Sequence, residues 1–198
     1  MQTTRRSFGK LVSGGALALA MGETLMGLSC SSVYADILKY VPVGLSAFAS
    51  VLSILSGGGV TIAPVVATIV ALVNAGFADL QAVVTAYDAA PAANKATLLG
   101  KISTALASVE ANLQGFWSNL TIPDTKLESI VQGLLGIITT TLLGFGTQLP
   151  APSPTPALMA RGSLRRTIAG TPTKRSVKQF RNDFNAILKQ NGMSEHAI

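Results

Sequence analysis

The sequence of 198 residues has few of the side chains that most protein chemistry requires, and charge is the first shortage. Only 12% of the residues are charged, against about a quarter in an average soluble protein. There is one cysteine, Cys30, and one histidine, His196. An intrachain disulfide and a metal site built on a histidine pair are therefore excluded, and a Ser-His-Asp triad is unsupported. Since the sequence also contains no dinucleotide fingerprint or nucleophile elbow, we expect a non-enzymatic protein without a metal or cofactor.

Acidic residues are scarce in the middle of the chain, and their spacing does not suggest paired acid–base chemistry. They stand singly on the expected helices, at Asp79, Asp88, Glu110, Asp124 and Glu128. We expect each carboxylate to lie on solvated surface, as most carboxylates do. We expect the same of His196, which lies close to the C-terminus. Phe116 and Trp117 are expected in the apolar core at a helix end, rather than around a ligand.

The net charge of +6 is carried by the two ends of the chain. Residues 33–149 contain six acidic and four basic side chains, whereas residues 150–198 contain eight basic and two acidic ones. The middle of the chain therefore has no basic face. Because nucleic-acid binding needs a basic stripe on a folded surface, we do not expect a nucleic-acid partner.

The N-terminus carries an export motif. Residues 4–10 read Thr-Arg-Arg-Ser-Phe-Gly-Lys, with Arg5 and Arg6 paired, Phe8 two residues later and then Lys10. A short, weakly apolar run follows, too short to be a good membrane anchor. This segment resembles the twin-arginine signal peptides of bacterial exported proteins. The resemblance implies passage across the inner membrane in the folded state, and a location in the periplasm or cell envelope, in some cases with membrane association.

The end of the export signal can be placed in two ways. Val33-Tyr34-Ala35 has the small-residue character of a cleavage site, which would make residues 1–35 the signal and Asp36 the new N-terminus. The alternative is a lipoprotein, with Cys30 as the lipidated residue. We favour cleavage after Ala35. Palmitate labelling distinguishes the two.

Residues 36–148 predict an all-α fold, an antiparallel four-helix bundle. Apolar residues recur at steps of three and four within segments 37–55, 62–89, 92–120 and 125–144, which is typical of amphipathic helices. The clearest seam is that of the third segment, formed by Leu98 (or Leu99), Ile102, Leu106, Val109, Leu113, Phe116 and Leu120.

Glycine and proline mark the boundaries of these segments. The run Gly57-Gly58-Gly59 predicts a turn, and Pro42 is expected to kink the first helix or to set its start. Thr125 and Glu128 fit a capping box at the start of the fourth helix.

The tail divides into a linker and a basic helix. Residues 149–173 have proline at alternate positions near their start, which is typical of a stiff, extended linker. Residues 174–198 predict a helix that ends at Asn191-Gly192, with Thr173 as its cap. Its candidate contacts with an anionic membrane surface or a partner are Lys174, Arg175, Lys178, Phe180, Arg181 and Phe184. The plainer interpretation, which we favour, is a helix docked on its own bundle or a partly disordered tail.

Two functions fit these features. The first is an exported envelope protein with a structural or interaction role. It would be a homo-oligomer or the partner of another envelope protein, and its first and fourth helices would bury their uncharged faces by this association. The alternative is a membrane-inserting hairpin, pore-forming or membrane-anchored, because residues 60–78 and 130–149 approach the length needed to span a bilayer. The first helix looks short for spanning. We favour the first function.

Overall fold

The computed structural model describes residues 15–149, 168 and 170–198, and of residues 15–31 only the backbone. All regular secondary structure in these residues is helical, with no strand. The elements are the five helices α1 (Gly15–Gly57), α2 (Pro64–Ala89), α3 (Ala92–Asn119), α4 (Thr125–Gly146) and α5 (Val177–Gln190), and a short 3-10 helix, η2 (Ser194–His196). The expected all-α class is confirmed.

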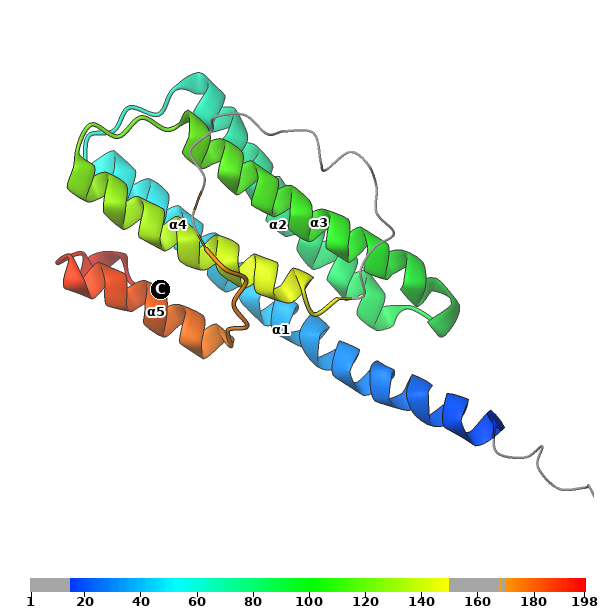
Figure 1. Cartoon of the computed structure of the whole chain (residues 1–198). Helices are drawn as coiled ribbons and strands as arrows, with labels where there is room; N and C mark the ends of the chain where they lie inside the picture. Colours follow the sequence, from blue (N-terminus) through cyan, green and yellow to red (C-terminus); the bar gives the residue numbers. More distant parts are fainter. Residues whose placement is uncertain (1–14, 150–167, 169) are drawn as a thin grey trace, which may run out of the picture.

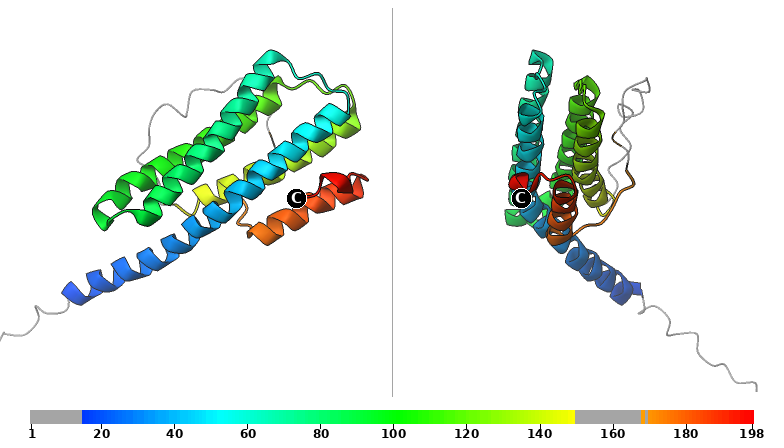
Figure 2. Two further views of the ribbon diagram at one scale, coloured as in Figure 1. Left: turned by 180° about the vertical axis from the view of Figure 1, so that it is seen from behind. Right: turned by 90° about the vertical axis from the view of Figure 1, so that its left-hand side faces the viewer.

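The helices form a bundle in which α1 and α4 lie between the other elements. α2 and α3 make the most extensive contact with each other, and they pack on α1 and α4 respectively. α5 contacts only α1, α4 and η2 among the described elements, and it lies on the side away from the α2–α3 pair (Figures 1 and 2). The α1–α2 and α3–α4 connections lie at one end of the bundle and the α2–α3 connection at the other (Figure 1).

Helix α1 is longer than its sequence predicts. It runs unbroken through Pro42, where we expected a kink or the start of the helix. Pro42 is exposed, so the backbone hydrogen bond that its missing N–H cannot make is lost on the solvent side, where bending costs least. The expected cleavage site after Ala35 lies inside this helix.

Two residues just before that site belong to the core. Val33 and Tyr34 are buried, and the Tyr34 ring lies 4.0 Å, centroid to centroid, from the ring of Tyr87 at the end of α2. A chain that begins at Asp36 would therefore lose a contact that joins α1 to α2.

The glycine run forms the predicted turn. Helix α1 ends in a Schellman motif, with the N–H of Val60 donating to the carbonyl of Leu55 at 3.0 Å and that of Gly59 to Ser56 at 3.1 Å. Gly59 has a φ of 70°, a conformation that costs glycine little. Leu127 of α4 packs against Gly58 so closely that a Cβ there would collide with it.

Both predicted helix caps are misplaced, that of α4 by one residue and that of α5 by three. Asp124, not Thr125, caps α4, and its Oδ1 accepts hydrogen bonds from the backbone N–H groups of Lys126 and Leu127 at 2.7 and 3.0 Å. Helix α5 begins after Ser176, which forms a capping box with Gln179, rather than after Thr173. Several cap-forming residues stand close together at both places, and only the packing of the helix selects one of them.

Among the described residues, three helical stretches are long and apolar enough to cross a membrane, namely Ser32–Gly57, Pro64–Ala89 and Thr125–Gly146. The expectation that the first helix is too short to span is therefore wrong. In the bundle the three differ in burial: 28% of the most apolar part of α2 is buried inside the molecule, against 67% for α4.

The predicted seam of α3 is confirmed from Ile102 to Leu120, where all six of its residues are buried, whereas Leu98 and Leu99 at its start are only partly buried. We therefore expect Leu106→Ala to lower the free energy of unfolding by about 2–5 kcal/mol, as deleting a buried leucine side chain usually does. Thermal or urea unfolding followed by circular dichroism measures this loss. Asn94→Ala, at an exposed position near the start of the same helix, is the control and should unfold as the parent does. A Leu106→Ala protein as stable as the parent would contradict this placement of the seam.

Candidate functional site

Helix α4 is the most enclosed element of the bundle. It carries no charged side chain from Ser129 onward, and α1, α3 and α5 all pack against it. We expected its uncharged face to be covered by association with another molecule. The structure covers that face with the chain's own C-terminal part instead, so this expectation is wrong for α4.

A short segment, residues 170–176, lies along α4 and leads into α5; we call it the strap. The backbone N–H of Thr173 donates to the carbonyl of Thr140 at 3.0 Å. Two glycines permit this close approach. A Cβ on Gly144 would collide with the backbone of Thr173, and one on Gly170 would collide with the side chain of Thr140. The strap therefore approaches α4 this closely because one residue of each contact is a glycine.

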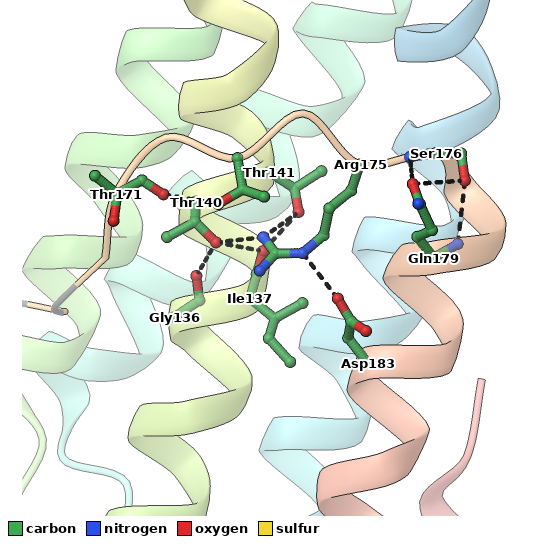
Figure 3. Close-up of polar contacts among 10 residues, drawn as sticks. Gly136, Ile137, Thr140, Thr141, Thr171, Arg175, Ser176, Gln179 and Asp183 are labelled. Atoms are coloured by element: carbon green, nitrogen blue, oxygen red, sulfur yellow. Dashed lines mark hydrogen bonds and ion pairs between the residues drawn. The ribbon is translucent and has the colours of Figure 1, made fainter.

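Arg175 fastens the strap to two helices (Figure 3). One of its guanidinium nitrogens, Nη1, donates to the Thr140 hydroxyl at 2.7 Å and more weakly to that of Thr141 at 3.4 Å. Its Nε pairs with Asp183 of α5 at 2.9 Å. The two hydroxyls in turn donate to the carbonyls of Gly136 and Ile137, each at 2.7 Å. Threonine is a poor helix former in the interior of a helix. The hydrogen bonds of the Thr140 and Thr141 hydroxyls account for the presence of threonine at these two positions.

Tyr40 joins α1 to α4 and α5. Its ring meets those of Phe145 and Phe180 edge to face, with centroids 5.3 and 5.0 Å apart, and its hydroxyl donates to the carbonyl of Ile138 at 3.3 Å. Burial raises the pKa of the Tyr40 hydroxyl far above its usual range, and the positive charge of Arg175 offsets a smaller part of that shift. Tyr40 therefore stays neutral and acts as a structural contact.

The candidate contact residues of α5 separate into two groups. Phe180 and Phe184 are fully buried and Arg175 mostly so, and these three belong to the packing of α5 on the bundle. The basic residues Lys174, Lys178 and Arg181 are exposed. Arg181 also lines a groove of about 540 Å³ between α1 and α5, together with Lys39.

The other candidate residues form no catalytic constellation. The described residues contain no cluster of three or more His, Cys, Asp or Glu side chains. Glu110 is half-buried rather than solvated, and burial raises the pKa of its carboxyl. His196 is also more enclosed than expected and lies 3.5 Å from a Glu195 oxygen. Phe116 and Trp117 are in the core, as predicted.

The exposed apolar surface is on α2. Val65 and Leu72 are 54% and 49% exposed, and no other large hydrophobic side chain in the described part of the chain is exposed to this degree. They lie seven residues apart, and a further seven residues lead to Asp79 on the same side of the helix. Asp79 lines a groove of about 540 Å³ between α2 and α3, with Lys101 and Ser108 of α3. The sequence seams traced only the buried sides of these helices, so this face was missed.

The residues of the predicted export signal, Arg5, Arg6, Phe8 and Lys10, lie outside the residues that the structure describes, as does most of the predicted proline-rich linker. The backbone of Cys30 belongs to α1, but its side chain is also outside the described part. Comparison of the chain with protein-family models, with curated proteins and with solved structures gives no match.

We expect Arg175→Met to loosen α5 from the bundle, because it removes a charge-assisted contact and leaves Asp183 unpaired. The expected loss in the free energy of unfolding is about 1.5–3 kcal/mol. Amide hydrogen exchange should accelerate in residues 177–190 and remain unchanged in α2 and α3. Lys174→Met, which removes an exposed charge from the neighbouring residue, is the matched control. Equal exchange in both variants would show that Arg175 does not hold α5.

Proposed function

We propose that this chain is an exported, non-enzymatic protein of the cell envelope that acts by self-association. In this proposal α1 to α4 form an antiparallel four-helix bundle. The positions of the connections at alternate ends (Figure 1) and the ring of contacts from α1 through α2, α3 and α4 back to α1 support that arrangement.

The observation that carries the proposal is the uncharged outward side of α2. From Pro64 to Ala78 the helix has no charged side chain, and Val65 and Leu72 are about half exposed there. Covering a leucine or valine completely is worth about 1.5–3 kcal/mol, so this surface gains from contact with another apolar face. Grouped apolar exposure on a folded protein is typical of an interaction site.

The resemblance of the N-terminus to twin-arginine signals supports export in the folded state. A folded bundle that already encloses α4 is a suitable passenger for such a route. The burial of Val33 and Tyr34 supports a mature chain that keeps these two residues. Lipidation at Cys30 keeps them, whereas cleavage after Ala35 removes them.

We expect the purified protein to be oligomeric and Leu72→Glu to be monomeric, because a carboxylate at a covered apolar position loses its hydration. Size-exclusion chromatography with light scattering, in buffer without detergent, measures the mass. Gln81→Glu adds the same charge at another exposed position of α2 and should leave the oligomer intact. A wild-type chain that is monomeric at about 100 μM, a concentration at which even weak contacts are populated, would defeat the proposal.

Membrane insertion is the second candidate, and the three stretches long and apolar enough to cross a bilayer favour it. For insertion the bundle would have to open, because α4 has its apolar residues covered within the molecule. That opening would also expose the bonds of Arg175 and Thr140 to lipid. The described packing therefore gives the associating, water-soluble bundle the stronger support.

Carbonate extraction of membranes from cells that export the chain separates the two candidates. We expect release of any chain that has not incorporated labelled palmitate, since an associating bundle has no span in the bilayer. Retention of an unlabelled chain would instead establish insertion. A palmitate-labelled chain is held by its lipid, so the labelled and unlabelled fractions are scored separately.

A further inference from the structure

We propose that the outer face of the α2–α3 pair is a homodimer interface, in which Asp79 of each subunit pairs with Lys101 of the other. The inference rests on the proposed self-association and specifies its surface, its symmetry and its charge contacts. Three properties of this face carry it: an uncovered groove, two unpaired charges at one level, and large side chains opposite small ones.

The groove lies between α2 and α3 on the side away from the core. Its volume is about 540 Å³, and Gly76, Ala82, Gly100 and Ala105 are among its lining residues. Such small side chains let another helix approach closely. The described residues leave this groove open, since α5 and the strap cover α1 and α4 on the opposite side of the bundle (Figures 1 and 2).

The two charges of the groove lie at the same height. Asp79 lies 11 residues before Ala90, in the α2–α3 connection, and Lys101 lies 11 residues after it. At 1.5 Å per residue, both are about 16 Å from that connection. Both are exposed, and neither forms an ion pair or side-chain hydrogen bond with another described residue. One acidic and one basic group at the same height therefore face outward without a partner among the described residues.

This arrangement selects one symmetry axis. Most homodimers have a two-fold axis, so the same patch faces itself. An axis running along the helices places α2 over α3 of the partner at equal heights, and Asp79 then faces Lys101 of the partner subunit. An axis across the helices at that height places Asp79 over its own copy, and like charges in contact are unfavourable. The charges therefore favour the axis along the helices.

The same axis matches large side chains with small ones. Leu72 and Ser108 each lie 18 residues from Ala90, and Val65 and Gly115 each lie 25 residues from it. The two exposed apolar side chains of α2 would thus rest on a serine and a glycine of the opposite α3. Each contact occurs twice in the dimer, which covers all four exposed apolar side chains.

A second copy of the chain fits this face better than lipid does. The face contains the aspartate Asp79 and the lysine Lys101, and Ser108 also lines the groove. A protein surface can pair such groups, whereas acyl chains leave them unsatisfied. Opposite charges at the edge of an apolar patch are typical of specific protein interfaces.

A charge-swap experiment tests the pairing. Asp79→Lys, Lys101→Asp and the double variant Asp79→Lys/Lys101→Asp are each made in the full chain, and association is measured by analytical ultracentrifugation at low salt. Each single variant should weaken the dimer by about tenfold or more, because each dimer then holds two like-charge contacts. The double variant should restore it. Mixing the two single variants in equal amounts should form a heterodimer, since every contact is then between opposite charges.

The possible failures are distinguishable. Single variants that associate like the wild type would overturn the groove as the interface while leaving self-association intact. Failure of both the double variant and the mixture would overturn the Asp79–Lys101 pairing, provided that circular dichroism shows the variants folded. A monomeric wild-type chain would remove the proposed function itself. Flotation of the wild-type chain, but not Leu72→Glu, with phosphatidylcholine vesicles would assign the face to lipid and overturn the dimer.

Discussion

The enclosure of α4 is the constraint on which the rest of the structure depends. α4 has no charged side chain beyond its first turn and buries most of its apolar residues, and its surroundings must also satisfy the hydroxyls that it carries. α1 and α3 cover part of it, and the C-terminal part of the chain supplies the remainder. Tyr40 and Arg175 make that cover specific, because the ring fixes the approach of α5 and the guanidinium bonds to Thr140 and Thr141.

Scarcity of charge gives each remaining charge a larger role. Arg175 is mostly buried and has its charge balanced by Asp183, and Asp124 is used as a helix cap. These charged groups stabilise the fold, and their side chains are already engaged in contacts within the molecule. Asp79 and Lys101 differ, since they face outward beside an open groove and form no ion pair or side-chain hydrogen bond with another described residue. These two charged side chains, which make no such contact, therefore lie on the outer face of α2 and α3.

The core of the bundle could be predicted from periodicity, and its connections only partly. The α3 seam was predicted residue by residue because one side of that helix is polar. Pro42 misled the prediction of α1, since proline inside a pattern usually ends a helix, and only its exposure explains why this one does not. The caps were misplaced where Thr125 follows Asp124 and where Thr173 precedes Ser176, because neighbouring residues cap equally well in isolation.

The sequence by itself determined the all-helical class, the glycine turn and the apolar seams, because these follow from local periodicity and backbone preference. It also predicts an export signal at the N-terminus, from a resemblance to twin-arginine signal peptides. Only the tertiary structure decided which uncharged face is covered and which is free. α2 and α4 have similarly apolar sequences. Their difference in burial arises from residues 170–190, which fold back over α4. Contacts between segments so distant in the chain depend on shape and hydrogen bonding, which a one-dimensional pattern does not contain.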